Sequence, residues 1–340
     1  MLNVLLTGCS EHAKEMVGCF KDNFRGEPVR VVGIDSDGKR VLKSHVDASY
    51  QVPRFTEPEY MDVLMGILER EHIDIIMPFI TQELLFMARN RGIFEEKGIK
   101  VSISSLESLE VANDKINLNK RFPRYMADQW VVSTGQDIRR FAIEHGYPEK
   151  RICVKLRNRA GGTGFCVADE EKGRNILLHN IARTNSYVTL GMLCELVDNY
   201  PDEVIVSEYV EGIEYSLCVL ADHGEIIHSL GFEGYTMQFG SCMTAAIRDN
   251  EQAYIIADNI VREIGLDGNA CFDYRISPEG KVVLLEINPR LSASLPFIKK
   301  AGLNLPYLRC MQLMGEDVRG LRFELNKNLT MRKYYETEFF

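Results

Sequence analysis

The sequence lacks the patterns that mark secreted, membrane-spanning or zinc-binding proteins. Its nine cysteines contain no Cys-x-x-Cys pair, and an odd number of cysteines spread over 340 residues is typical of reduced core thiols. None of the seven histidines lies at metal-ligand spacing from a cysteine or another histidine. The apolar start at residues 1–8 has no basic leader and is too short for a signal core, and no run approaches the roughly 18 apolar residues of a membrane span. These absences predict a cytoplasmic protein that does not contact a membrane.

Basic residues are also in deficit. The chain has 40 lysines and arginines against 49 acidic residues, a net charge of -9, whereas a general nucleic-acid-binding protein needs a basic face. Nucleic acid is therefore not expected as a partner. At roughly 100 to 200 residues per domain, a length of 340 residues predicts two or three units with a sizeable total core.

The first hundred residues alternate between expected strands and helices. Such alternation predicts a parallel, doubly wound sheet. Only Gly8 follows the first strand, where a dinucleotide-binding G-x-G-x-x-G fingerprint needs three glycines, so NAD binding is not expected. The expected strands are 4–7, 29–34, 73–77 and 100–103, and the expected helices are about 11–24, 57–71 and 83–97.

The remaining chain has a mixed pattern, and we divide it into two further units. After an α/β unit at 1–112, we place a unit with a glycine-rich loop at 113–200 and a unit with an acidic hairpin at 201–340. A helix is expected at 252–264, where isoleucines spaced four residues apart form a core stripe. The other expected elements are a helix at 136–145, strands at 152–156 and 165–168, and antiparallel strands at 204–209, 214–221, 225–232 and 270–275.

The hairpin near the C-terminus carries the strongest chemical signal. Asp273 lies in one apolar strand, a Ser-Pro-Glu-Gly turn follows, and Glu286 lies in the return strand, so the two acids can face each other across the ladder. Asn288 is two residues after Glu286 and points to the same face, before Pro289 makes continuation of the strand doubtful. Oxygen ligands of this number favour Mg2+, which completes its shell with water and phosphate. The alternative is a surface hairpin with ordinary charges, but an acid within so apolar a run needs a partner or a metal.

A second signal is a glycine-rich loop that follows a lysine-bearing strand. Lys155 gives a point charge, and backbone N–H groups in such a loop can approach phosphate oxygens closely. No Gly-Lys-Ser/Thr follows, so this is not a Walker A loop, and a plain hairpin loop is the alternative. The loop includes Arg159, Gly161, Gly162, Thr163 and Gly164.

A third, weaker signal is a strand, a glycine hinge and another strand at 206–215. Its acids include Glu208 and Glu214, and an extended hinge can offer backbone groups to adenine and a carboxylate to ribose. Solvated hairpin acids would explain the same segment equally well.

Taken together, these segments occur in the order and spacing of the ATP-grasp superfamily. The series begins with Lys115, continues through the loop after Lys155 and the hinge, and ends with the hairpin up to Arg290. The sequence resembles most the ligases related to the large subunit of carbamoyl phosphate synthetase, over about residues 1–310. The separation of the two hairpin acids by 13 positions is also similar to that in D-alanine:D-alanine ligase. The resemblance implies a pre-ATP-grasp α/β domain at 1–112, a small lobe or lid at 113–200 and a large lobe at 201–340.

The resemblance also implies how nucleotide and metal would be held. Lys115 and Lys155 would hold the α and β phosphates, and the glycine loop would close over the β and γ phosphates. At the other end, Glu208 would accept from the adenine amino group, the backbone of Tyr209 and Val210 would read the ring edge, and Glu214 would bind ribose. Asp273, Glu286 and Asn288 would hold Mg2+, with Mn2+ as an alternative ion.

For the reaction, the resemblance implies electrostatic rather than nucleophilic catalysis by the protein. Arg290 would stabilise charge on the transferred phosphoryl group, Lys155 would bind phosphate, and Arg159 and Arg290 are the candidates for binding the substrate carboxylate. Cys271 departs from several relatives, which have arginine or glutamine two residues before the first metal acid. A single ATP-grasp unit also argues against synthesis of carbamoyl phosphate by the full family mechanism.

We therefore expect an ATP-dependent carboxylate-amine ligase that forms an amide or peptide bond through an acyl phosphate. The alternatives are an ATP-grasp small-molecule kinase and a non-catalytic nucleotide-binding protein. The expected partners are a small carboxylate and an amine. Family members are often dimers, and the aromatic tail at 331–340 would pack on the core or on a second subunit, so a homodimer is an open expectation.

Overall fold

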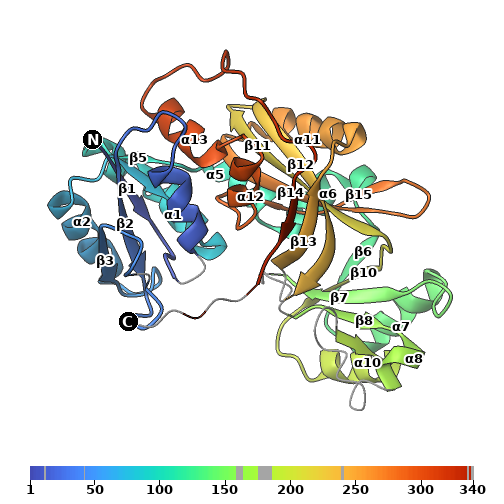
Figure 1. The fold of residues 1–340 in the computed structure, drawn as a ribbon. Coiled ribbons are helices and arrows are strands. Elements are labelled where there is room, and N and C mark those ends of the chain that lie inside the picture. Colours follow the sequence, from blue (N-terminus) through green and yellow to red (C-terminus); the bar gives the residue numbers. More distant parts are fainter. Residues whose placement is uncertain are drawn as a thin grey trace.

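The computed structural model describes residues 1–10, 13–41, 43–157, 164–174, 186–238, 241–334 and 337. Within these residues the chain forms two five-stranded sheets and one six-stranded sheet. Figure 1 shows that each sheet carries its own helices, with the six-stranded sheet between the other two. The described part of the chain contains no helix with the length and apolar character needed to cross a membrane.

The N-terminal sheet is parallel and doubly wound, as predicted. Its strand order is β3-β2-β1-β4-β5, so the order reverses between β1 and β4. The predicted helix at 83–97 is split near Asn90, whose Nδ2 donates to the Phe86 carbonyl at 2.8 Å in competition with the helical ladder. The strands are β1 (Leu2–Leu6), β2 (Val29–Asp35), β3 (Ala48–Gln51), β4 (Ile75–Met77) and β5 (Lys100–Val101), and the helices are α1 (Lys14–Lys21), α2 (Tyr60–Arg70), α3 (Leu84–Arg89) and α4 (Arg91–Glu96).

The small sheet has the order β6-β10-β7-β8-β9 and packs one face against helices α7 and α10. Strand β10 lies between β6 and β7, although it begins after the predicted boundary at residue 200. Strand pairing therefore extends this unit to Glu208, while the domain bounds themselves stay a prediction. The elements are α5 (Leu106–Ala112), α6 (Lys115–Arg121), β6 (Gln129–Val132), α7 (Gly135–Glu144), β7 (Ile152–Leu156), β8 (Cys166–Ala168), α8 (Glu170–Arg174), β9 (Ser186–Val188), α10 (Leu190–Asp198) and β10 (Val204–Glu208).

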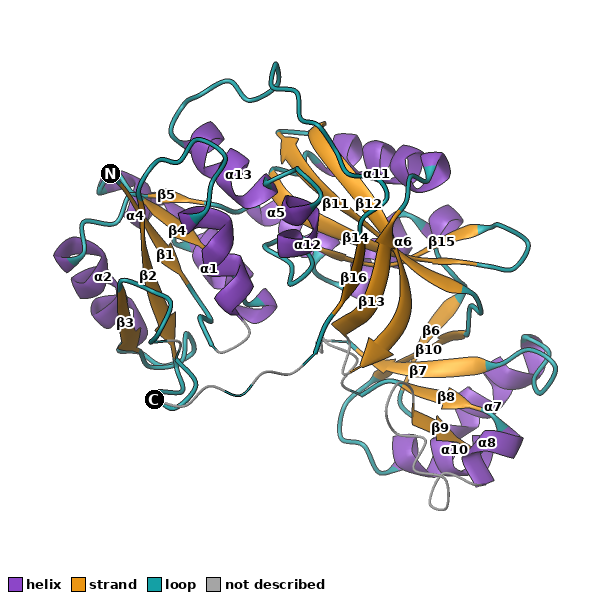
Figure 2. Ribbon diagram, in the orientation of Figure 1, coloured by secondary structure: helices purple, strands orange, loops and turns teal. Residues whose placement is uncertain are grey.

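The large sheet is antiparallel, with the order β15-β14-β11-β12-β13-β16. Helix α11 covers one face, burying Ile256 and Ile260 of the predicted stripe, while α12, α13 and α1 cover the other (Figure 2). Gly265 ends α11 with φ 64°, a left-handed conformation that favours glycine. The elements are β11 (Ile213–Asp222), β12 (Glu225–Gln238), β13 (Ser241–Ile247), α11 (Glu251–Ile264), β14 (Gly268–Ile276), β15 (Val282–Asn288), α12 (Leu295–Lys300), α13 (Leu305–Leu313) and β16 (Thr330–Arg332).

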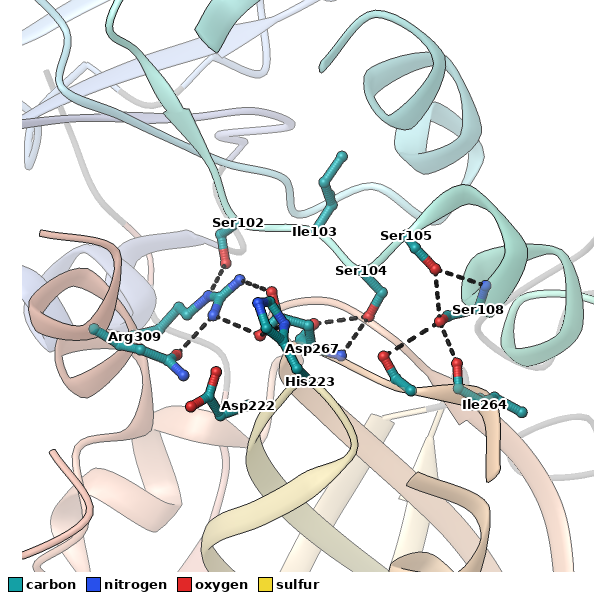
Figure 3. Close-up of polar contacts among 12 residues, drawn as sticks. Ser102, Ile103, Ser104, Ser105, Ser108, Asp222, His223, Ile264, Asp267 and Arg309 are labelled. Atoms are coloured by element: carbon teal, nitrogen blue, oxygen red, sulfur yellow. Dashed lines mark hydrogen bonds and ion pairs between the residues drawn. The ribbon is translucent and has the colours of Figure 1, made fainter. Parts of the chain in front are cut away.

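A buried ion pair joins the large sheet to the segment that leaves the N-terminal sheet (Figure 3). Arg309 on α13 holds Asp267 in a bidentate pair, with Nη1 3.0 Å from Oδ1 and Nη2 2.6 Å from Oδ2. Its Nε also donates to Ser102 Oγ at 3.3 Å, and Ser104 Oγ donates to the Asp267 carbonyl at 2.7 Å. Asp267 also lies near Asp222 and His223, but the Arg309 charge already compensates its carboxylate. We therefore interpret this cluster as a structural contact between the large lobe and the segment that follows the N-terminal sheet.

Candidate nucleotide and metal site

The two hairpin acids face each other, as predicted. Asp273 on β14 pairs directly with Glu286 on β15, and Asn288 lies on the same face two residues further on. Asn288 Nδ2 donates to Asp273 Oδ2 at 2.9 Å and lies 3.4 Å from Glu286 Oε1. Ser216 on the neighbouring strand β11 donates to Asp273 Oδ1 at 2.6 Å. The three predicted metal ligands thus converge at one point of the large sheet.

Two lysines from other parts of the chain reach the same acids. Lys115 Nζ lies 2.7 Å from Glu286 Oε2. Lys115 begins α6, whose N-terminus is capped by Asp114 through hydrogen bonds from the Ile116 and Asn117 amides at 2.8 and 3.0 Å. Lys155 lies on β7 of the small sheet, and its positive charge also acts on Glu286. The structure therefore brings the predicted phosphate-binding lysines and the predicted metal acids together.

Burial acts on both acids in the same direction, but nearby charges shift their pKa values in opposite directions. Burial raises the pKa of Asp273 to about 7, and the charge of Glu286 adds to this, against the hydrogen bond from Ser216. Burial also acts to raise the pKa of Glu286, but Lys115 and Lys155 outweigh it and hold this pKa below its usual range. The pair thus concentrates negative charge that a bound cation would stabilise.

The donor set fits Mg2+, because two carboxylates and an amide offer only oxygen ligands once the amide is turned. In the described arrangement Asn288 Oδ1 accepts from Arg290 Nη2 at 3.0 Å, and its nitrogen faces the acids. A rotation of the side-chain amide would exchange these two atoms and would give up the hydrogen bond from Arg290 Nη2.

Arg290 lies just after β15, the strand that carries Glu286 and Asn288. Strand β15 ends at Asn288, before Pro289, which agrees with the doubt about continuation. Arg290 nevertheless stays beside the predicted metal ligands through its contact with Asn288, and its Nε donates to Thr81 Oγ1 at 2.8 Å. Thr81 of the N-terminal unit and Asn288 at the end of β15 thus together hold the Arg290 guanidinium beside the acids.

The predicted ribose ligand lies on the same face of the large sheet. Glu214 pairs across the ladder with Arg275, whose Nη2 lies 2.6 Å from Glu214 Oε1. Burial raises the pKa of Glu214, although the charge of Arg275 opposes this. Residues 214, 216, 273 and 275 form two directly opposed pairs, so the predicted ribose ligand and the predicted metal acids share one face.

The predicted adenine ligands lie at the end of β10. In the register of β10 with β7, Glu208 pairs with Ile152. The Glu208 side chain therefore lies on the face that packs against α7 and α10, whereas Lys155 lies on the opposite face of the sheet. The role of the Glu208 carboxylate in binding adenine stays a prediction, and this register argues against it. The Tyr209 amide donates to the Arg151 carbonyl at 2.9 Å, and Val210 follows it.

The glycine loop lies largely outside the described residues. This applies to Arg159, Gly161, Gly162 and Thr163, so their roles stay predictions. Gly164 is described, with φ 75°, and a β-carbon there would come within 2.4 Å of the Leu156 side chain. The positive φ, together with this contact, therefore favours glycine at this end of the loop.

Sequence reasoning did not select Ser216, Arg275 or Thr81 as site residues. Arg275 had a usable signal, because it is two residues after Asp273 in one strand and shares its face. Ser216 and Thr81 depend on pairings between distant segments, which no local pattern indicates.

Two family models match parts of the chain. Residues 4–102 match the family described as PylC-like, N-terminal domain, and residues 200–337 match the family described as ATP-grasp in the biosynthetic pathway with Ter operon. The second match contains the hairpin with both predicted metal acids.

Named relatives are distant in sequence. The carbamoyl phosphate synthase large chain of Bifidobacterium longum (strain DJO10A) is 22% identical over 298 residues, covering 82% of this chain and 25% of the relative. The large chain of Archaeoglobus fulgidus is 26% identical over 298 residues, covering 82% of this chain and 26% of the relative. The chain therefore spans about a quarter of the length of these relatives.

Solved structures share the fold over almost the whole chain. N5-carboxyaminoimidazole synthetase from Staphylococcus aureus, complexed with ADP, has a TM-score of 0.68 at 15% identity, covering 95% of this chain and 80% of that one. The biotin carboxylase domain of Hydrogenobacter thermophilus 2-oxoglutarate carboxylase has a TM-score of 0.67 at 18% identity, covering 96% and 73%. L-amino acid ligase from Bacillus licheniformis has a TM-score of 0.64 at 14% identity, covering 95% and 78%.

These matches confirm the predicted resemblance to the ATP-grasp superfamily. They also confirm the predicted fold class, an N-terminal α/β unit followed by a two-lobed ATP-grasp fold. The solved structures bear on the fold alone at these identities.

Proposed function

We propose that this chain is an ATP-dependent carboxylate-amine ligase. The observation that supports this best is the convergence of Asp273, Glu286 and Asn288 with Lys115, whose Nζ lies 2.7 Å from Glu286. Such a site binds the phosphates of a nucleotide through cations on either side of a metal. The names of the relatives and structural neighbours, which include a synthase, a synthetase and an amino acid ligase, favour C–N bond formation over other uses of ATP.

In the proposed reaction, a carboxylate oxygen of the first substrate attacks the γ phosphorus of ATP, and the bond to the β–γ bridging oxygen breaks to release ADP. An amine then attacks the acyl carbon, phosphate leaves with the former carboxylate oxygen, and the amine gives up a proton. Lys115 and Lys155 would bind phosphate oxygens throughout. Arg290 would stabilise the charge on the transferred phosphoryl group, and together with Arg159 it would bind the carboxylate.

The proposed metal is Mg2+, with Mn2+ as an alternative, held by Asp273, Glu286 and Asn288. When bound, the ion supplies positive charge that neutralises phosphate oxygens and orients them. Lys115 has three N–H donors, so it could bind a phosphate oxygen while it keeps its contact with Glu286.

The proposed nucleotide site extends from these cations toward the hinge. Glu214 would bind ribose, with Arg275 holding its other oxygen, and the main chain of Tyr209 and Val210 would contact the adenine edge. The loop at 160–164 would close over the β and γ phosphates, with Gly164 at its end.

The proposed setting is the cytoplasm, with small-molecule partners and neither nucleic acid nor membrane. All nine cysteines are free thiols, which supports a reducing compartment. A homodimer is also proposed, on the family tendency alone, and gel filtration with light scattering would test it.

Hydroxylamine trapping tests this proposal. The purified protein is incubated with Mg-ATP, a panel of carboxylates and hydroxylamine, which attacks acyl phosphates to give hydroxamates. A hydroxamate that requires both ATP and one carboxylate supports the ligase. ADP release with an alcohol and no hydroxamate would instead support a small-molecule kinase, and tight Mg-ATP binding without turnover would support a non-catalytic nucleotide-binding protein.

A further inference from the structure

The N-terminal unit makes a direct polar contact with the proposed reaction centre. Arg290 Nε donates to Thr81 Oγ1 at 2.8 Å, although the two residues are 209 positions apart. Thr81 begins the short 3-10 helix Thr81–Glu83, which follows β4 at the carboxyl end of the N-terminal sheet. This end lies at the point where the strand order reverses between β1 and β4, the usual place for a functional loop in such a sheet.

The hydrogen bond to Thr81 fixes the Nε edge of the planar Arg290 guanidinium. Arg290 Nη1 also donates to the Leu291 carbonyl at 2.6 Å, and Nη2 donates to Asn288 Oδ1 at 3.0 Å. In the part of the chain that the structure describes, these contacts and the Thr81 contact occupy three of the five guanidinium N–H groups. The N–H groups that are left belong to Nη1 and Nη2, a pair that can bind a carboxylate or a phosphoryl group side by side. Turning the Asn288 amide so that its oxygen faces a metal would free a further N–H group of Nη2 and would leave the Thr81 contact unchanged.

Thr81 is itself held from two directions. Asn113 Nδ2 donates to the Thr81 carbonyl at 3.3 Å, and Asn113 lies two residues before Lys115. On the other side, the buried Glu83 is hydrogen-bonded to the Thr7 hydroxyl, and Thr7 Oγ1 accepts from the Phe79 amide at 3.1 Å. The segment 78–83 is therefore tied both to β1 and to the start of the helix that carries Lys115.

We propose that Thr81 is a positioning residue, whose hydroxyl oxygen fixes the Arg290 guanidinium so that its remaining N–H pair faces the reacting carboxylate and phosphoryl group. The N-terminal unit is then part of the site, because it sets the orientation of a cation carried by the large lobe. This inference rests on the proposed function, in which Arg290 binds the reacting anions.

The variants Thr81→Val and Thr81→Ser test the inference. Valine keeps the shape of threonine and removes the hydroxyl, whereas serine keeps the hydroxyl. We expect Thr81→Val to lower kcat roughly 10- to 100-fold, the range for a hydrogen bond to a charged group, with little change in the KM for ATP. Thr81→Ser should stay within about threefold of the wild type, because it still accepts from Nε. Thr56→Val, the same chemical change at an exposed position of the N-terminal unit, is the matched control.

A binding measurement separates failure of this inference from failure of the proposed function. Calorimetric titration of inorganic phosphate into the Mg-ADP complex reports on the Arg290 cation without any turnover. If no carboxylate and amine pair supports turnover, the ligase proposal fails, but Thr81→Val should still weaken phosphate binding roughly tenfold while Thr81→Ser does not. Equal kcat and equal phosphate affinity in Thr81→Val and Thr56→Val would overturn the inference, as would a wild-type complex that binds no phosphate.

Discussion

Replacing Arg309 by methionine should destabilise the protein strongly. Arg309 is 2% exposed and Asp267 7% exposed, and the bidentate contacts of 2.6 and 3.0 Å are the main compensation for this carboxylate. Methionine fills similar space, so the chief effect is an uncompensated buried charge, for which a loss of about 3–5 kcal/mol is expected. At about 2–4 °C per kcal/mol for large domains, the first thermal transition should fall by roughly 6–20 °C.

Differential scanning calorimetry measures this change, since a chain with three sheets need not unfold in two states. The matched control is Arg262→Met, which breaks the exposed pair with Asp258 and should cost about 0–1 kcal/mol. The double variant Arg309→Met, Asp267→Asn should recover much of the loss, because no unpaired charge is left. A transition temperature for Arg309→Met close to that of Arg262→Met would refute the claim that the Arg309–Asp267 pair stabilises the fold.

Three further predictions concern the site and the segment behind it. Lys115→Met should weaken Mg-ATP binding, measured by calorimetry, by roughly tenfold or more, because a charged phosphate contact is lost. The control Lys120→Met, at an exposed position of the same helix, should not change the affinity. Equal affinities of the two variants would show that Lys115 does not bind the nucleotide. Glu286→Gln and Asn288→Ala should abolish turnover while circular dichroism stays unchanged, and chelation of Mg2+ should abolish wild-type turnover until the ion is restored; normal turnover in both variants would contradict the metal assignment. Burial raises the pKa of Glu83 from 4.5 to about 7, so the folded state keeps its proton longer than the unfolded state and stability is lost as pH rises through this window. Glu83→Gln should therefore raise the melting temperature more at pH 8 than at pH 5, and a pH-independent difference would show that Glu83 is not the titrating group.

The hairpin that carries the two predicted metal acids was predictable because its turn is local. A short turn joins β14 to β15 and pairs Tyr274 with Leu284, a register that by itself would place Leu285 opposite Asp273. A shift of the register between Asp273 and Tyr274 brings Glu286 opposite Asp273 instead, and no local pattern indicated that shift. The parallel N-terminal sheet was predictable for a similar reason, since buried strands alternate with amphipathic helices. The contact of Lys115 with Glu286, by contrast, joins distant segments and was indicated only by the family resemblance.

The elements that sequence reasoning missed depend on their neighbours. Strand β16 has three residues and pairs with the edge strand β13. Helix α10 was obscured because Met192 and Leu196 are exposed at 42% and 53%, which blurs its amphipathic pattern. Sequence reasoning missed Thr81 for a similar reason, because its hydrogen-bond partner Arg290 lies in another unit of the chain.

The most direct test of the ligase assignment is ADP release from Mg-ATP against pools of carboxylates, with and without pools of amino acids and amines. The account predicts release that requires one carboxylate and one amine together, and that is lost in Glu286→Gln. Release that needs an alcohol and no amine, or no release despite tight Mg-ATP binding, would contradict it.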